Sequence, residues 1–318
     1  MIKDGATRDG YGEALVELGN SDPNVVVLDS GVSDSTRTIK FGQKFPERFF
    51  NMGISEADMV CTAAGLARTG KVAFATSFAC FLLGRTMDQI LVSIAYSNSN
   101  VKLAGTHTGL AVGEDGPSAQ MIVDLAYTRA MPNMIVIQPA DWEEAVQATK
   151  ALSKYFGPAY LRLGRPKLKG IYDSTYKFEI GKGNIIRQGS DAVIFAYGPI
   201  MLPQAYIAAE KLESEYSISV KVVNIPWLNT INKTWLKEII GNIKQIYTLD
   251  NHLMSGGQGE KIGSVIAQLG LDNISLKMLG LTGIPVCGLN DEVIVYYELD
   301  TNSIVKVIAN SHSSIRQV

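Results

Sequence analysis

The sequence predicts two α/β domains, each a doubly wound and mostly parallel sheet covered by helices. Three observations lead to this prediction. Short apolar runs alternate with stretches of helical periodicity along the chain. The alternation is interrupted once, at residues 164–170, and 318 residues are enough for two domains of ordinary size. Strands and helices alternating at this spacing form βαβ units, whose parallel sheet is covered on both faces.

The first part of the chain supplies the larger domain. Thr7 is expected to cap its first helix, and Pro23 and Asp29 bound its first strand. The expected helices cover residues 8–18, 56–68, 87–96, 119–130 and 142–155. The expected strands cover residues 24–28, 72–75, 101–105 and 134–138.

The stretch Gly164-Arg165-Pro166-Lys167-Leu168-Lys169-Gly170 breaks the pattern and begins a linker. The same alternation then restarts, with expected strands at 193–197, 220–225 and 243–249 and expected helices at 202–216, 233–240, 260–269 and 303–310. The predicted domains are therefore residues 1–170 and 187–318, joined by a linker over 171–186.

Composition argues against several classes of function. A formal charge of −2 does not favour nucleic-acid binding, which usually needs a basic face. No apolar run approaches membrane-spanning length, and the N-terminus lacks the apolar core of a signal peptide. Cys61, Cys80 and Cys287 lie far apart, outside any metal-ligand spacing, which is typical of reduced cysteines in a cytoplasmic protein.

Two short stretches carry most of the chemical information: Gly53-Ile54-Ser55-Glu56, and the run from Thr106 to Pro117 that reads THTGLAVGEDGP. Glu56 has apolar neighbours in the sequence and no basic one, so burial would penalise its charged form. Taken alone, it also fits a helix-start glutamate favoured by the helix dipole. The second stretch follows a predicted strand, at the edge of the sheet where open α/β folds bind ligands. Its glycines allow close backbone approach, and His107 and Asp115 can bond sugar hydroxyls.

In this order and at this separation, the two stretches resemble the pyrimidine-binding half of thiamine-diphosphate enzymes of the transketolase family. The resemblance runs from about Thr7 to Arg165 and continues more weakly through the second domain. There Asp250-Asn251-His252 precedes Gly256-Gly257-Gln258-Gly259, whose spacing is not that of a dinucleotide fingerprint and fits a strand-to-helix turn. His252 is expected to be structural or to contact a subunit. The chain lacks the Gly-Asp-Gly motif with which such enzymes hold the cofactor's diphosphate through a divalent metal.

The resemblance implies roles for individual residues. Glu56 would be catalytic and cofactor-binding, because a carboxylic acid bonded to the pyrimidine N1′ activates thiamine diphosphate. Phe78 and Phe81, one βα unit later, would stack on the pyrimidine ring. His107 would be the second catalytic residue. The residues expected to bind the substrate, including an anionic group suited to the arginine fork, are Arg8, Ser35, His107, Asp115 and Arg165.

Three positions depart from the family pattern. Ala119 stands where a second histidine is common, and Gly31 where an aspartate often follows the first strand. Gly84 aligns with a further aromatic residue of the family, so the aromatic platform is expected to be smaller. Losing an imidazole bears on the identity of the substrate more than on the cofactor chemistry.

The resemblance also implies a partner chain. Split forms in bacteria and archaea place the diphosphate-binding domain on a separate subunit, and this chain begins directly at the pyrimidine domain. We therefore expect the C-terminal subunit of a split transketolase, working with an N-terminal diphosphate-binding subunit in an α2β2 arrangement. The partner would bind most of the Mg²⁺ or Ca²⁺. The expected reaction transfers a two-carbon ketol unit from a ketose phosphate, or a similar acid-bearing sugar, to an aldose.

Two other interpretations remain open. A β subunit of a 2-oxo-acid dehydrogenase, or a deoxyxylulose-phosphate synthase fragment, shares the glutamate and the architecture. The Thr106–Pro117 run and the Leu-Gly-Arg-Pro-Lys ending at residues 163–167 favour transketolase over both. A non-catalytic paralogue that binds a partner without turnover is supported by Gly31 and Ala119 alone.

Overall fold

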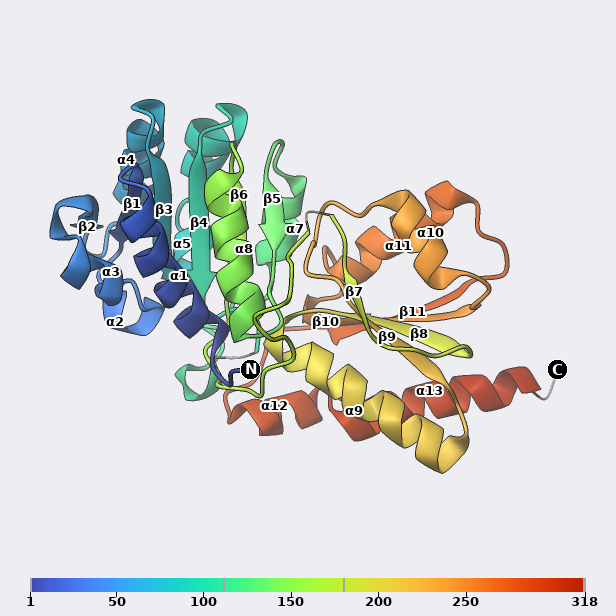
Figure 1. The fold of residues 1–318 in the computed structure, drawn as a ribbon. Coiled ribbons are helices and arrows are strands. Elements are labelled where there is room, and N and C mark those ends of the chain that lie inside the picture. The colour runs from blue at the N-terminus through green and yellow to red at the C-terminus, as the bar shows by residue number, and fades with distance from the viewer. Residues whose placement is uncertain (1, 111, 180, 317–318) are drawn as a thin grey trace.

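Two α/β domains lie side by side in the computed structural model, which describes residues 2–110, 112–179 and 181–316 (Figure 1). The first holds a 6-stranded sheet of order β2-β1-β3-β4-β6-β5, in which neighbouring strands pair in parallel. The second holds a 5-stranded sheet of order β11-β10-β8-β9-β7, in which β7 pairs antiparallel with β9 and the other pairs are parallel. The predicted fold class is confirmed.

The first domain has its strands at β1 (Val25–Asp29), β2 (Phe49–Asn51), β3 (Val72–Phe78), β4 (Val101–Thr106), β5 (Ile135–Ile137) and β6 (Ala159–Arg162). Its α-helices are α1 (Thr7–Ser21), α2 (Ser33–Thr36), α3 (Ile39–Lys44), α4 (Glu56–Arg68), α5 (Ala79–Gly84), α6 (Met87–Gln89), α7 (Asp124–Ala130) and α8 (Trp142–Lys154). A π-helical turn, η2 (Ile90–Tyr96), continues α6, and short 3₁₀ turns lie at η1 (Pro46–Arg48) and η3 (Gly113–Asp115).

Alternating side chains of β1 explain why this sheet is covered on both faces. Val25 and Val27 pack in a cluster with α1 and α8, whereas Val26 and Leu28 pack in another cluster with α4, α5 and α7. Figure 1 shows α1 and α8 together on the near face of the sheet. A strand buried on both faces must be apolar throughout, and that is the run the sequence shows.

The second domain repeats this plan on a smaller sheet, with strands β7 (Asn184–Arg187), β8 (Ala192–Ala196), β9 (Val220–Asn224), β10 (Gln245–Leu253) and β11 (Ser275–Leu281). Its helices are α9 (Gly198–Tyr216), α10 (Lys233–Ile240), α11 (Gln258–Leu269), α12 (Asn290–Tyr296) and α13 (Thr301–Arg316). Helices α9 and α13 cover one face, and α10 and α11 cover the other (Figure 1). Strand β7 begins inside the predicted linker, before residue 187.

Two local expectations were wrong. The helix expected over 119–130 begins only at Asp124, because the preceding loop pairs with the loop after β4, where the Gly109 amide donates to the Met121 carbonyl at 2.7 Å. Thr7 does not cap α1, whose N-cap is Ala6. The buried Thr7 hydroxyl instead accepts a hydrogen bond from the Gly164 amide at 2.7 Å. It thereby ties the start of α1 to the chain just beyond β6.

A buried ion pair of the first domain also contacts the second domain. Arg162, at the end of β6, donates through Nε to Asp124 Oδ2 at 2.7 Å, and both side chains are fully buried. Its Nη2 donates to the Asn251 carbonyl of β10 at 2.9 Å. Burial disfavours the Arg162 charge, but Asp124 outweighs it, so the pKa of the guanidinium is raised. The Asn251 side chain in turn accepts from the Leu110 amide at 2.8 Å.

The glycine cluster after β10 forms a strand-to-helix turn, as predicted. Asp250 accepts hydrogen bonds from the Gln258 and Gly259 amides at 2.8 and 2.9 Å, which fixes the start of α11. His252 is buried, and its Nε2 accepts from the Leu125 amide at 3.2 Å. Its contacts are therefore those of a structural residue.

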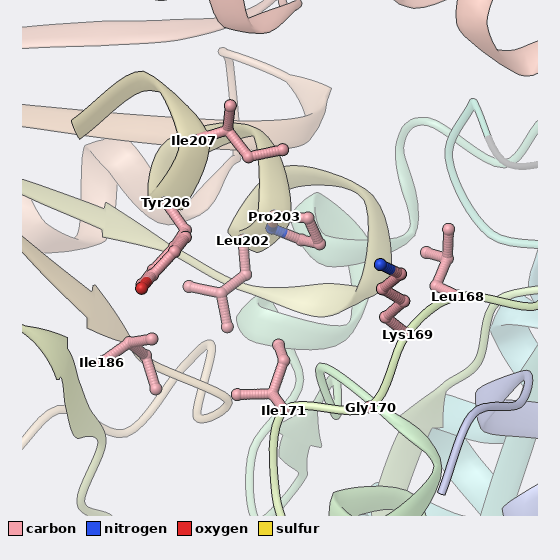
Figure 2. A pocket seen from close by; sticks show the side chains of 9 residues that line it. All are labelled: Leu168, Lys169, Gly170, Ile171, Ile186, Leu202, Pro203, Tyr206 and Ile207. Atoms are coloured by element: carbon pink, nitrogen blue, oxygen red, sulfur yellow. The ribbon is translucent and has the colours of Figure 1, made fainter. Parts of the chain in front are cut away.

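An apolar pocket of about 510 Å³ lies where residues 168–171 pass the start of α9 (Figure 2). Most of its wall is aliphatic, and Tyr206 and Lys169 bring polar groups to it. None of the residues expected to carry chemistry lines it. Across the described ranges, no helix is both long and apolar enough to cross a bilayer.

We expect Arg162→Met to lower the free energy of unfolding by about 3–5 kcal/mol, because it leaves the Asp124 carboxylate buried and uncompensated. Urea unfolding followed by circular dichroism measures this loss. Arg68→Met, at an exposed arginine on α4, is the control and should change stability by no more than about 0.5 kcal/mol. Equal losses in both variants would contradict a special role for the buried pair.

Candidate active site

A polar cavity of about 340 Å³ opens at the carboxyl edge of the first sheet. Its wall gathers residues that follow β1, β3, β4 and β6 together with the start of α1, namely Arg8, Asp34, Ser35, Arg37, Phe78, His107, Asp115 and Arg165. All five residues expected to bind substrate are in this set. Asp34 and Arg37 were not predicted, although both lie within two residues of Ser35 in the polar segment after the first strand. Their position at the sheet edge was the available signal.

His107 follows β4 in a left-handed conformation, with φ of 59°, and packs on Phe78 with ring centroids 3.8 Å apart. Arg8 Nη1 lies 3.3 Å from Nε2, and the Thr106 hydroxyl lies 2.9 Å from Nδ1. Because arginine can only donate, Nε2 is the acceptor and this network assigns the proton to Nδ1. Burial, followed by the charges of Arg8 and Arg165, lowers the pKa of His107 to about 3. The ring is therefore neutral near pH 7.

Arg8 presents an unsatisfied cation at the cavity. Its Nη1 donates to the Ser35 carbonyl at 2.9 Å, and its Nε is buried without a partner among the described residues. Burial, and next the charge of Arg37, lower the pKa of Arg8. A buried donor without an acceptor is costly, so an anion in the cavity would stabilise this arrangement.

Asp115 and Arg165 form an exposed pair that also lines the cavity. Arg165 Nη1 lies 3.2 Å from Asp115 Oδ2 and 2.8 Å from the Val112 carbonyl, and both side chains are nearly half exposed. Exposed pairs contribute at most about 1 kcal/mol, so either partner can exchange the other for a ligand.

Glu56 begins α4 and its side chain is only 4% exposed. The sequence shows no basic neighbour, but the fold brings one. Arg85, 29 residues later, donates through Nη1 to both carboxylate oxygens, at 3.0 and 3.1 Å. The same guanidinium lies 4.3 Å above the Phe81 ring. The local sequence could not predict this pairing, because it is made by tertiary structure.

Phe78 and Phe81 connect Glu56 with the cavity. Their rings stack with centroids 5.7 Å apart and planes 14° apart. A chain of contacts therefore runs from Glu56 through Arg85, Phe81 and Phe78 to His107. A Cβ added at Gly84 would meet nothing within 4 Å, so the place of a larger aromatic platform is open.

The arrangement has two chemically different ends. One end offers a buried carboxylate beside stacked aromatic faces, which suits a planar nitrogen heterocycle. The other offers guanidinium groups, a serine and a neutral imidazole, which suit an anionic, hydroxylated molecule. Among the residues that the structure describes, no group of three or more His, Cys, Asp or Glu side chains is placed to hold a metal ion.

Two family models match the chain. The transketolase pyrimidine-binding domain matches residues 3–170, and the transketolase C-terminal domain matches residues 181–304. The cavity lies wholly within the first match.

The chain is 43% identical over 305 residues to a putative transketolase C-terminal section from Methanocaldococcus jannaschii, covering 95% of this chain and 94% of that protein. It is 29% identical over 303 residues to one subunit of the apulose-4-phosphate transketolase of Phocaeicola vulgatus, covering 95% and 96%. A solved split-gene transketolase, described as an inactive β4 tetramer, superposes with a TM-score of 0.88 at 37% identity, covering 96% and 97%. The chain spans only 48% to 50% of the mammalian transketolases and transketolase-like proteins that it matches.

The lowered pKa of His107 predicts a specific pH dependence of stability. Between about pH 3 and 6.5, the unfolded chain binds a proton at this residue that the folded chain does not. The free energy of unfolding therefore falls as the pH falls through this window. His107→Gln should make this fall less steep, as measured by urea unfolding at pH 7, 6, 5 and 4. An unchanged slope would contradict the buried, neutral imidazole.

Proposed function

This chain belongs to the transketolase family, and we propose that it is the C-terminal subunit of a split transketolase. It would transfer a two-carbon ketol unit from a ketose phosphate, or a similar acid-bearing sugar, to an aldose. The observation that carries the proposal is the convergence of Arg8, Ser35, His107, Asp115 and Arg165 on one cavity. That cavity adjoins the wall that leads through Phe78 and Phe81 to Glu56.

The residues present fit the aminopyrimidine end of thiamine diphosphate. Glu56 is a buried carboxylate joined through Arg85 to a stacked aromatic pair, and a Cβ added at Gly84 would meet nothing within 4 Å. We propose that Glu56 bonds the pyrimidine N1′ and that Phe78 and Phe81 hold the ring. Thiamine diphosphate, when bound, supplies the electron sink needed to break and form a carbon–carbon bond beside a carbonyl.

The site residues of this chain would each have a specific role in that reaction. Glu56 would hold a proton at a carboxyl oxygen, and Arg85 must release or share that carboxylate for it to do so. Neutral His107 keeps its proton on Nδ1, so Nε2 can accept a hydrogen bond from a substrate hydroxyl once Arg8 turns to an anion. Asp115 would recognise the hydroxyl beside the reacting carbonyl, and Arg165 would bind the anionic end of the substrate.

A second subunit is part of the proposal. The chain would bind an N-terminal, diphosphate-binding subunit in an α2β2 arrangement, in the cytoplasm. That partner would bind most of the Mg²⁺ or Ca²⁺ with the diphosphate. Relatives support the need for a partner, because one is named as a single subunit of its transketolase and another is described as inactive when it forms a β4 tetramer.

We expect Glu56→Gln to lower turnover about 10²–10³-fold in the assembled enzyme, because an amide cannot supply a carboxylic acid proton. The melting temperature should stay close to that of the wild type, since glutamine has the same shape. Initial rates with a ketose phosphate and an aldose measure the first effect, and thermal unfolding measures the second.

Asp58→Asn is the matched control, because it removes an exposed carboxylate two residues further along α4. It should leave turnover within about twofold. Full activity in the Glu56 variant would remove Glu56 from the cofactor site. No ketol transfer by the assembled wild type, with any sugar tested, would favour the non-catalytic paralogue.

A further inference from the structure

Arg37 lines the substrate cavity although it was not among the residues that the resemblance marked. It follows α2 and adopts a left-handed backbone conformation, with φ of 70° and ψ of 8°. That region disfavours residues with a Cβ, and such strain persists where the surroundings impose it. Strained residues cluster at functional sites, so the position warrants a physical explanation.

Hydrogen bonds and close packing fix the position of Arg37. Its Nε donates to Asp9 Oδ1 at 2.7 Å, and its Nη1 donates to the Asp34 carbonyl at 2.9 Å. A Cβ at Gly12 would lie 2.6 Å from the Arg37 Cβ, so the bare glycine of α1 makes room for it. The side chain of Asp29 accepts from the Thr36 and Thr38 hydroxyls at 2.7 and 2.8 Å. Both residues flanking Arg37 are therefore anchored.

Three guanidinium groups line the cavity together with two carboxylates, Asp34 and Asp115, so the lining carries one excess positive charge. Arg37 is paired with Asp9 and Arg165 with Asp115. Arg8 instead bonds neutral acceptors, the Ser35 carbonyl and the His107 ring. The three guanidinium groups act on one another, since the charges of Arg37 and Arg165 both lower the pKa of Arg8, after burial. Like charges held together in a partly buried site are unfavourable until an anion joins them.

We propose that Arg37 is a specificity-determining residue, which completes with Arg8 and Arg165 an anion site that selects a phosphate ester over a carboxylate or an uncharged sugar. A phosphate carries close to two negative charges at neutral pH and three acceptor oxygens. Three guanidinium groups that line one cavity can each engage one of those oxygens. A carboxylate has one charge and two oxygens, so it gains little from a third arginine.

The competing explanation is that Arg37 only fastens α2 to α1 through Asp9. The two explanations differ for Asp9→Asn, which removes the anchoring carboxylate but keeps the guanidinium and its bond to the Asp34 carbonyl. If Arg37 binds phosphate, Asp9→Asn retains affinity and Arg37→Met loses it. If Arg37 is only an anchor, the two variants behave alike.

The test titrates inorganic phosphate into the full chain and follows the ³¹P NMR linewidth at pH 7.5 and low ionic strength. We expect Arg37→Met to weaken phosphate binding about tenfold, the size of one charge-assisted hydrogen bond at a partly exposed site. Arg37→Lys keeps the positive charge but lacks the planar guanidinium, so its phosphate affinity should lie between those of the wild type and Arg37→Met. Asp9→Asn should stay within threefold of the wild type. Acetate, followed by ¹H NMR, should bind all of these proteins with similarly low affinity.

Lys40→Met is the control, because it removes an exposed positive charge three residues further on, in α3. It should leave phosphate affinity within twofold, and thermal unfolding of each variant establishes that it is folded. Equal weakening by Arg37→Met and Lys40→Met would reduce the effect to net charge. Equal weakening by Arg37→Met and Asp9→Asn would assign Arg37 a structural role. Either result would overturn the proposal.

The identity of the ester as a sugar phosphate rests on the proposed function, and a second measurement separates the two. In the assembled enzyme, Arg37→Met should raise KM for a phosphorylated donor about tenfold and leave KM for an unphosphorylated donor nearly unchanged. Ketol transfer with equal effects on both donors would refute the role of Arg37. If Arg37→Met loses phosphate binding but the assembled wild type shows no ketol transfer, the proposed function is refuted and the anion site is retained.

Discussion

The buried pair of Asp124 and Arg162 is the constraint on which the site depends. Both side chains are fully buried between the two domains, where an unpaired charge would be very costly. Arg162 donates hydrogen bonds to the Asp124 carboxylate, the Gln138 side chain and the Asn251 carbonyl. These bonds hold β6, the start of α7 and β10 together. This guanidinium is therefore one of several groups that fix the relative position of the two domains, together with bonds such as that from Asn224 to Glu144.

That position in turn shapes the loop that carries His107 and Asp115. The Asn251 side chain accepts a hydrogen bond from the Leu110 amide. Gly109 has φ of 62°, and a Cβ at this position would clash with the Asn251 side chain. The C-terminal domain therefore supports the loop after β4, although it contributes none of the described residues that line the polar cavity. The Gly164 amide donates to the Thr7 hydroxyl at 2.7 Å, which joins the two chain segments that carry Arg8 and Arg165.

The sequence predicted the parts of this structure that depend on local pattern. Apolar runs located β1, β3, β4 and β5 of the first sheet and β8, β9 and β10 of the second, but not the internal strand β6. The predicted substrate-binding residues line one cavity in the structure. The sequence did not predict the ion pair between Arg85 and Glu56, because 29 residues separate them and only tertiary folding brings them together. Arg37 was missed for a different reason. Its backbone strain and its pairing with Asp9 are visible only in three dimensions. Short edge strands such as β2 and β7 carry too few apolar residues to stand out.

The central claim is that this chain supplies half of a thiamine-diphosphate site whose other half lies on a second subunit. Calorimetric titration of thiamine diphosphate with Mg²⁺ tests it most directly, first on this chain alone and then on its mixture with an N-terminal diphosphate-binding subunit from the same genome. The account predicts tight binding in the mixture and weak or no binding to the chain alone. Tight binding to the chain alone, or no binding in either sample, would contradict it.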